Sequence, residues 1–499
     1  MSIRANQFVR RFKTSSAFVF WVFAVLSWQA TTAYAEEPPA VEPPAGDQKP
    51  AAVVEPAAGD QEPPVAESAD DDEKKDAPTS AEPSGPQIAE EEKWANWGTT
   101  KRDQKWVASP TETLARDPRN WVADESYHPG WITVPGMPIE FRFGGFIELN
   151  LIHDFQNAGI PSGEFIPSLI PAPTDFTPNT EFDIRSTRFI FESRTKAKTT
   201  WVSVFLSMDF AGTTSGTPGP RLRQAYFTFS GLLIGRAYGT FFDVQTWPDI
   251  FDLEGPNAMT ASRTEMVRYS YGIVKSGQQQ VPDKVIATIA LENPETSVTN
   301  GVGLKAWPEL VARLDLNYGW GHMAFMALGR QLIAESTLGT GKASQYTGSG
   351  AMSFKLLLPG SQAKHENAPS DDLVGQVTYG TAGGDYIQDL EALGGQDGYY
   401  NDATQQILTR RQLAIWGGYE HSWADQWHSA FVAGYLLVSN LAIEPADSYK
   451  SSIYTDVNIT FRPIPRFAIS CEYYFGRRTN KDDEQGHSHR LMGVFKFTI

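Results

Sequence analysis

The sequence is poor in cysteine, and this limits how the fold can be held together. Cys471 is the only cysteine among 499 residues, so no disulfide can form within the chain. A catalytic thiol would need a His and an Asn or Asp placed beside it by the fold, and the residues around Cys471 do not suggest such a set. We expect this residue to have a structural position in a strand.

Long hydrophobic runs are also missing. A membrane-spanning helix needs about 20 consecutive apolar residues; the run at 17–28 is shorter, and no later run reaches that length. This run follows four basic residues and precedes Ala33-Tyr34-Ala35, a pattern that predicts a secretory signal peptide at residues 1–35. The mean hydropathy of −0.34 argues against membrane helices. It does not exclude a β-barrel, whose strands expose only alternate residues to lipid.

Motifs that carry catalysis are not found either. The sequence has no GxSxG, HExxH or P-loop pattern. His487 and His489 have strand spacing but no evident third ligand, so solvated histidines are expected rather than a zinc site. The oxygen-rich segment 397–402 lacks the spacing of an EF-hand. We therefore expect no catalytic residue, no metal site, no cofactor and no nucleic-acid partner.

Residues 36–92 contain no aromatic side chain, although they hold 11 of the 33 prolines. They carry 17 acidic and 3 basic residues, and an imperfect repeat relates 42–48 to 55–61. Such a segment buries too little apolar surface to offset its chain entropy. We expect a disordered, acidic periplasmic arm, and contact with the cell wall or a basic partner is the alternative role.

Residues 93–138 form a transitional segment between this arm and the first predicted strand. It contains five scattered tryptophans, Trp94, Trp97, Trp106, Trp121 and Trp131, and ends in Pro135-Gly136 and Pro138. A plug, a short helix and a subunit contact all remain open for this segment.

From Ile139 onward, alternating segments are separated by Gly, Pro, Asn and Asp, which predicts strands joined by turns. We expect sixteen strands, an even number that leaves both ends of the barrel chain on the periplasmic side. The predicted strands span 139–154, 181–197, 199–211, 220–230, 232–242, 263–274, 283–293, 308–320, 322–334, 346–358, 371–384, 407–420, 426–439, 448–462, 465–478 and 487–499. The predicted fold is an all-β, 16-stranded antiparallel transmembrane β-barrel over residues 139–499.

The last strand shows the alternation clearly. Phe495, Phe497 and Ile499 fall on one face, and Arg490 and Lys496 fall on the other. This segment alone is equally compatible with the edge strand of a soluble sandwich. Charged inner faces in other strands, such as 308–320 and 448–462, favour a water-filled lumen instead. We expect the last strand to close the barrel against residues 139–154.

Arginine recurs along the predicted strands. An arginine that faces lipid at the bilayer midplane costs about 2–4 kcal/mol, so these side chains should face the lumen, where guanidinium groups favour anions. The alternative is that they pair with lumenal carboxylates such as Asp183, Glu192, Asp209, Asp315 and Glu472. The residues expected to line the pore and bind solute are Arg188, Arg221, Arg223, Arg236, Arg268, Arg313 and Arg462.

The connection at 243–262 is long and partly apolar, with the sequence Trp247-Pro-Asp-Ile-Phe-Asp-Leu-Glu-Gly-Pro256. We expect it to fold into the lumen as a constriction loop. Asp249, Asp252 and Glu254 would then lie opposite the arginines of the neighbouring strands. An ordinary external loop is the alternative.

Several short motifs, in their order and spacing, resemble a known family over residues 134–499. They are Val134-Pro-Gly136 before Gly144-Gly145-Phe146-Ile147, Arg185-Ser-Thr-Arg-Phe189, Met208-Asp-Phe210, Arg221-Leu-Arg-Gln-Ala-Tyr226, Leu233-Ile-Gly-Arg236, Thr240-Phe-Phe-Asp243, Asp252-Leu-Glu-Gly-Pro256, Val267-Arg-Tyr269 and Glu472-Tyr-Tyr-Phe-Gly-Arg-Arg478. The family is that of the DcaP-like trimeric outer-membrane porins, which are related to the phosphate-selective porins.

This resemblance implies a sixteen-stranded trimeric channel for small, often anionic, organic solutes. It also implies basic constriction residues at Arg188, Arg221, Arg223, Arg236 and Arg268. Two features depart from the family pattern: the acidic arm stands in place of a coiled-coil segment, and Asp385 stands where a basic residue is expected.

The expectation is thus a passive porin of the bacterial outer membrane, in contact with lipid, forming a homotrimer and preferring small anionic solutes. The alternative is a non-conducting barrel that anchors the envelope or binds a partner through its acidic arm. A surface hydrolase built on a barrel is disfavoured because no nucleophile and base motif is present.

Overall fold

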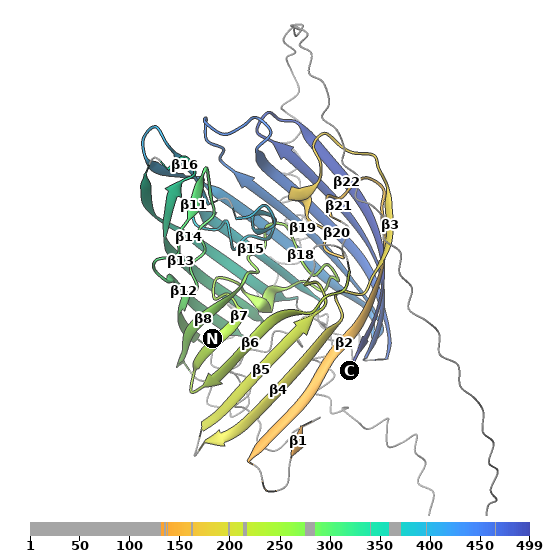
Figure 1. The fold of residues 1–499 in the computed structure, drawn as a ribbon. Helices are drawn as coiled ribbons and strands as arrows, with labels where there is room; N and C mark the ends of the chain where they lie inside the picture. Colours follow the sequence, from red (N-terminus) through yellow and green to blue (C-terminus); the bar gives the residue numbers. More distant parts are fainter. Residues whose placement is uncertain are drawn as a thin grey trace, which may run out of the picture. The chain divides into compact units, whose positions relative to one another are not determined.

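A computed structural model describes the part of the chain that contains the predicted barrel (Figure 1). The described residues are 131–133, 136, 138–160, 163–197, 200–212, 217–274, 285–339, 341–358, 371–395, 397–464 and 466–499. The predicted signal peptide, the acidic arm and most of the transitional segment lie outside these residues, and their boundaries remain predictions.

Sixteen antiparallel strands form a closed barrel. They are β2 (Ile139–Asp154), β4 (Arg188–Ala197), β5 (Thr200–Asp209), β6 (Arg221–Phe229), β7 (Leu232–Tyr238), β8 (Arg263–Val274), β9 (Val285–Glu292), β12 (Glu309–Tyr318), β13 (Gly321–Ser336), β14 (Lys342–Leu357), β15 (Asp372–Gly380), β18 (Gln412–Ala424), β19 (Trp427–Val438), β20 (Tyr449–Ile464), β21 (Phe467–Asn480) and β22 (Gln485–Thr498). β2 pairs with β22 on one side and β4 on the other, so the sheet closes on itself. The predicted fold class is therefore confirmed.

Shorter elements decorate this wall. β1 (Ile132–Thr133), β3 (Asn179–Asp183) and β11 (Gly301–Gly303) extend the main sheet, whereas β10 (Val298–Thr299), β16 (Gly398–Asn401) and β17 (Gln406–Thr409) form a separate sheet. Among the described residues, the helical segments are η4 (Pro167–Leu169), η5 (Val244–Thr246) and α4 (Gln388–Ala392). Within the described ranges, no helix has the length and hydropathy needed to cross a membrane.

Two of the predicted strands are interrupted. Residues 181–197 were expected to form one strand, but a turn at 184–187 separates β3 from β4, and both pair with β2. The Asp183 carboxylate accepts a hydrogen bond from the Arg185 backbone N–H at 2.9 Å, which favours a turn over an extended strand. Similarly, predicted strand 407–420 is divided between β17 and β18.

The last strand lies as expected. Phe495 and Phe497 are each 46% exposed on the outer face of β22, whereas Arg490 is fully buried on the inner face. Its Nε atom lies 2.6 Å from Oδ1 of Asp154 on β2. Lys496 Nζ lies 2.8 Å from Glu148 Oε2, also on β2. Two ion pairs therefore join the first and last strands inside the barrel.

Not all of the inner face of the barrel is polar. β18 and β19 turn Ala414, Trp416, Val432 and Leu436 inward, and all four are buried. Contact between apolar side chains and water is unfavourable. Apolar side chains inside a barrel are therefore stable only where other parts of the protein pack over them. The inward-folded connections described below supply that cover.

Because lipid surrounds the outer face of the barrel, the free-energy cost of a charged side chain on that face should depend on its depth in the bilayer. Val457 lies in the middle of β20 and is 43% exposed. We expect Val457→Lys to lower the free energy of unfolding by about 2–4 kcal/mol, and Ser451→Lys, near the end of the same strand, by about 0–1 kcal/mol. Urea unfolding of the barrel in lipid vesicles measures both, and equal losses at the two positions would contradict the assigned faces.

Candidate constriction site

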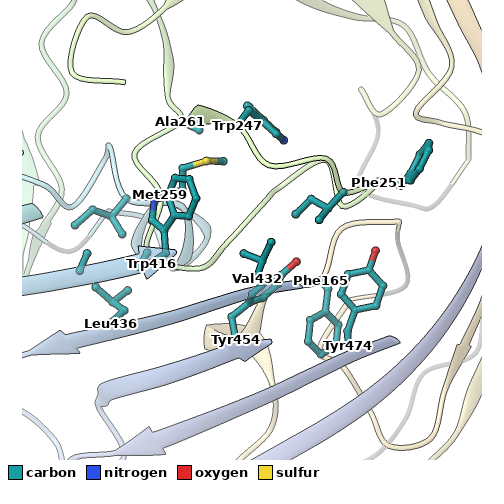
Figure 2. Close-up of a cluster of buried hydrophobic side chains, with 14 of the residues drawn as sticks. Phe165, Trp247, Phe251, Met259, Ala261, Trp416, Val432, Leu436, Tyr454 and Tyr474 are labelled. Carbon is teal, nitrogen blue, oxygen red and sulfur yellow. The ribbon is translucent and has the colours of Figure 1, made fainter. Parts of the chain in front are cut away.

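The connection between β7 and β8 folds into the barrel and packs against the inner wall of β18–β22. Trp247, Phe251 and Met259 of this loop are buried in one cluster with strand residues. Figure 2 shows Met259 beside Trp416, and Phe251 above the strands that carry Val432 and Tyr454. The loop therefore covers the apolar inner face, and the predicted inward fold is confirmed.

Charged side chains fix the beginning of the loop. Asp243 accepts a hydrogen bond from the backbone N–H of Gln245 and so caps η5. Its carboxylate also lies 2.8 Å from Arg313 Nη2 and 2.9 Å from His322 Nε2. Arg313 reaches Asp315 as well, at 2.5 Å. Asp243, Asp315 and His322 bring three metal-ligating groups together, and the Arg313 guanidinium lies within ion-pair distance of both carboxylates.

A second contact fixes the middle of the loop. Arg462 Nη2 lies 2.9 Å from both carboxylate oxygens of Asp249. Asn458 donates to the Asp249 backbone carbonyl at 2.8 Å, and the Phe251 backbone N–H donates to Glu472 at 3.0 Å. Arg313 and Arg462, which were expected to bind solute, thus hold the loop against the wall.

Two further connections also enter the lumen. Phe165 and Ile170 near η4 are buried in the same cluster as the β7–β8 loop. The Ser168 hydroxyl donates to the carbonyl of Asp389 in α4 at 2.8 Å, and the Gln388 backbone N–H donates to the Met259 carbonyl at 3.0 Å. The apolar run Phe165-Ile-Pro-Ser-Leu-Ile170 could have signalled this burial.

A group of four arginines lies on the inner side of β4, β6 and β8, and we call it the basic wall: Arg188, Arg221, Arg223 and Arg263. A β-bulge in the pairing of β5 with β6 leaves Arg223 as the extra, unpaired residue of β6. Asp209 on β5 lies 2.9 Å from Arg221 and 2.5 Å from Arg223. One carboxylate is therefore shared by two guanidinium groups, and the basic wall has a net positive charge.

Arg188 is the member of this wall whose hydrogen-bonding capacity is unused. It is 2% exposed, and within the described residues its Nε and Nη2 atoms have no hydrogen-bond partner. Its guanidinium carbon lies 5.4 Å from the centroid of the Phe146 ring. Arg223 and Arg263 add nearby positive charge. Burying guanidinium nitrogens without acceptors is costly.

Three carboxylates on the inward connections oppose the basic wall, and we call them the acidic group: Glu164, Glu254 and Glu391. Glu164 Oε1 lies 3.8 Å from Arg221 Nη2. Burial, followed by repulsion from Glu164 and Glu391, raises the pKa of Glu254 well above its usual value. Arg263 is the cation that interacts with both Glu254 and Glu391. Positive charge thus lies on the wall and negative charge on the inward connections, and the two meet at Arg221 and Glu164.

Two of the predicted arginines lie outside this arrangement. Arg236 was expected to line the pore, but it faces outward, where its Nη1 lies 2.7 Å from Oε1 of Glu265. The β7–β8 register pairs these two residues on the face that also exposes Val267 and Tyr269. Arg268 faces inward and donates to the Tyr238 carbonyl at 3.3 Å.

The three acidic residues predicted to lie in the constriction loop have different contacts. Asp249 pairs with Arg462 as described, and Asp252 accepts hydrogen bonds from Tyr454 at 3.0 Å and from the Phe165 backbone N–H at 3.3 Å. Glu254 is the predicted loop acid that faces the basic wall. Sequence reasoning missed Arg263, Glu164 and Glu391, because their proximity depends on how three separate connections fold inward.

Comparisons with known proteins agree with this architecture. Residues 194–497, well over half of the chain, match the DcaP outer membrane protein family. The chain belongs to this family. The predicted membership and the predicted location in the bacterial outer membrane are thereby confirmed, and the DcaP family is one of outer-membrane porins rather than of enzymes. No curated protein matches the chain.

Solved structures similar to this DcaP-family chain are barrels. The outer membrane channel DcaP of Acinetobacter baumannii is 17% identical, with a TM-score of 0.63 over 74% of this chain and 99% of that chain. An anion-selective porin from Comamonas acidovorans is 8% identical, with a TM-score of 0.46 over 72% of this chain and 100% of that chain. OmpT of Vibrio cholerae is 10% identical, with a TM-score of 0.43 over 73% and 99%. The first of these supports the fold.

Loss of a loop anchor should loosen the constriction. Phe251 is 2% exposed between the loop and the wall, and Phe251→Ala removes buried contacts worth about 3–5 kcal/mol. We expect noisier single-channel currents and faster proteolysis of the loop. Phe176→Ala, at an exposed position of another connection, should change neither. Identical behaviour of the two variants would contradict the role of this contact.

The contact between loop and wall should also weaken as pH rises. Burial raises the pKa of Asp252 to about 7, with Arg490 as the cation that opposes the shift. Between its usual pKa and this value, the Asp252 carboxyl of the folded barrel therefore keeps a proton that the same group loses in the unfolded chain. Its contribution to the stability of the folded state is present at low pH and is lost as pH rises from about 4 through 7.

Current fluctuations recorded between pH 5 and 8 test this expectation. They should grow with pH in the wild type and depend less on pH in Asp252→Asn. Asp482→Asn, in an exposed connection, is the control and should behave as the wild type. Fluctuations that decrease as pH rises would refute the assignment.

Proposed function

We propose that this DcaP-family barrel is a passive porin for small hydrophilic solutes, preferentially those with an anionic group, through an arginine-lined lumen. The observation that supports this most strongly is the basic wall, in which one carboxylate, Asp209, is shared by two of the four guanidinium groups. A carboxylate or phosphate matches the paired donors of a guanidinium.

A solute would pass by exchanging part of its hydration shell for hydrogen bonds from side chains of the protein. An anionic group that reaches the basic wall loses part of its water shell and gains hydrogen bonds from Arg221, whose side chain is 31% exposed. Arg188, Arg223 and Arg263 add positive charge nearby. Because Asp209 already occupies Arg221 and Arg223, the remaining attraction stays moderate. Moderate, multiple contacts let a solute leave as well as enter.

The loop contacts support a fixed constriction rather than a second binding site. Arg313 and Arg462 are occupied by Asp243, Asp315 and Asp249, so we assign them to the position of the loop. The solute-binding assignment is kept for Arg188, Arg221, Arg223 and Arg268. We also propose a homotrimer, as the family resemblance implies, which native mass spectrometry of the detergent-solubilised protein would test.

Ion selectivity tests the central part of the proposal. In planar bilayers under a KCl gradient, the reversal potential should indicate a preference for chloride over potassium. Arg188→Gln should reduce that preference by up to about fivefold, the factor for one lost interaction of about 1 kcal/mol between charges 4 Å apart in water. Arg411→Gln, an exposed arginine of a connection, is the matched control. Cation selectivity of the wild type would contradict the proposal.

Deleting residues 36–92 separates this function from that of a barrel that only binds a partner. The truncated chain should keep the wild-type conductance, because every residue of the basic wall lies in the barrel. Loss of conductance without loss of folding would favour the acidic arm as the functional part.

A further inference from the structure

Three side chains form a compact group where the β7–β8 loop begins. Asp315 of β12 and His322 of β13 lie on neighbouring strands (Figure 1), and Asp315 pairs with Ala324, two residues from His322, so both face the lumen. Asp243 joins them from the loop. One possible ligand atom from each of the three residues lies within 4.8 Å of the others, and all three residues are buried. Carboxylate oxygens and imidazole nitrogens are ligands that Zn²⁺ takes in proteins.

The hydrogen bonds of His322 direct a lone pair toward the two carboxylates. Its Nδ1 lies 2.9 Å from Oδ1 of Asn317. An amide oxygen only accepts hydrogen bonds, so the proton of the neutral imidazole lies on Nδ1 and the lone pair on Nε2. Nε2 lies 2.9 Å from Asp243 Oδ2 and 3.7 Å from Asp315 Oδ1. Acceptors at these distances repel one another, and a cation between them removes the repulsion.

The charges of this group also leave room for a cation. Arg313 Nη2 lies 2.8 Å from Asp243 Oδ1 and 2.5 Å from Asp315 Oδ1, so the second oxygen of Asp243 is left to His322. Two carboxylates, one guanidinium and a neutral imidazole sum to one negative charge, which is costly to bury. Hydrogen bonds that hold a ligating carboxylate, and an oxygen that accepts from the second nitrogen of a ligating His, are the usual outer contacts of a metal site.

We propose that Asp243, Asp315 and His322 bind a divalent transition-metal ion, and that Zn²⁺ is the ion that matches this donor set best. An imidazole ligand disfavours Mg²⁺ and Ca²⁺, which take oxygen ligands. In a tetrahedral site with bonds of about 2.0–2.2 Å, ligand atoms lie about 3.3–3.6 Å apart. The observed 2.9 and 3.7 Å therefore require shifts of a few tenths of an ångström. The Ser353 hydroxyl, 2.5 Å from Asp243 Oδ2, or a water molecule supplies the fourth ligand.

The bound ion joins the constriction loop to the barrel wall at the first turn of the loop. Asp243 caps η5, whereas Asp315 and His322 belong to β12 and β13. Occupancy by the metal thus adds a crosslink to the ion pair that Arg313 already makes. No local motif predicts this site, because Asp243 meets the other two ligands only after the loop has folded inward. The inference goes beyond the solute preference proposed above and does not depend on it.

Titration of the full-length protein with Zn²⁺ tests the proposal. The protein is prepared in detergent without a histidine tag. Because the rings of His487 and His489 lie 5.8 Å apart on the outer face, both are replaced by Gln in the background chain. After treatment with EDTA and removal of the chelator, calorimetry should give one Zn²⁺ per chain. Co²⁺ in its place should give the visible absorption of a tetrahedral site with nitrogen and oxygen ligands.

Variants of the background chain identify the ligands. His322→Gln should weaken Zn²⁺ binding by at least about tenfold, and Asn317→Leu, which removes the contact that positions the ring, by about 10–100-fold. His421→Gln is the matched control, because His421 Nδ1 lies 2.9 Å from a single carboxylate, that of Asp371. It should bind Zn²⁺ as the background chain does. Migration on unheated gels verifies that each variant is folded.

Each outcome decides for or against the site. A folded background chain that binds no Zn²⁺ overturns the proposal, since the second proton of the His322 ring then takes the place of the ion. Binding that survives His322→Gln also overturns it and assigns the zinc to another part of the surface. Neither result bears on the porin function, and a channel without anion preference would leave the zinc site standing.

Discussion

The inner side of β18 and β19 carries Trp416, Val432 and Leu436, and side chains of this kind are each stabilised by about 1.5–3 kcal/mol when they leave water. The β7–β8 loop meets this requirement with Trp247, Phe251 and Met259 (Figure 2). Hydrophobic burial alone would allow the loop to slide. The Asp249–Arg462 and Asp243–Arg313 ion pairs fix the position of the loop at two points. The position of every other lumenal group follows from where this loop rests.

Because the loop rests on one side, the two sides of the lumen differ. The side of β18–β22 is filled by protein, and the side of β4–β8 keeps its arginines with few carboxylate partners. Arg188 lacks acceptors there, while Arg221 and Arg223 share Asp209. The same loop carries Glu254 toward the basic wall. Packing on one side of the barrel thus determines the electrostatics of the other.

Side-chain alternation with a period of two predicted the barrel and its closure, since Arg490 and Lys496 do reach β2 through Asp154 and Glu148. It also placed most of the arginines inside. It could not tell which of them bind a carboxylate, because Asp243 and Asp249 reach Arg313 and Arg462 only after the loop has folded inward. Arg236 shows a second limit. Its strand ends two residues later, so the outer position of the Arg236–Glu265 pair depends on the register with β8.

Long-range contacts explain why the acidic group as a whole was not predicted from the sequence. Glu164, Glu254 and Glu391 are far apart in the sequence, and each comes from a connection that gave only a weak apolar signal. Their proximity arises from hydrogen bonds such as that from Ser168 to the Asp389 carbonyl, which no local pattern encodes. The family resemblance identified the fold and the basic strands, and the structure added the acidic group opposite them.

Thiol accessibility in the conducting channel tests most directly whether the path for solutes runs along the basic wall and not under the loop. In a Cys471→Ser background, Arg221→Cys should react with a water-soluble, charged methanethiosulfonate reagent and reduce the current, because the Arg221 side chain is 31% exposed. Val432→Cys, buried beneath the loop, should remain unreactive in the same recording. Modification of Val432→Cys with a drop in current, or protection of Arg221→Cys, would contradict this account.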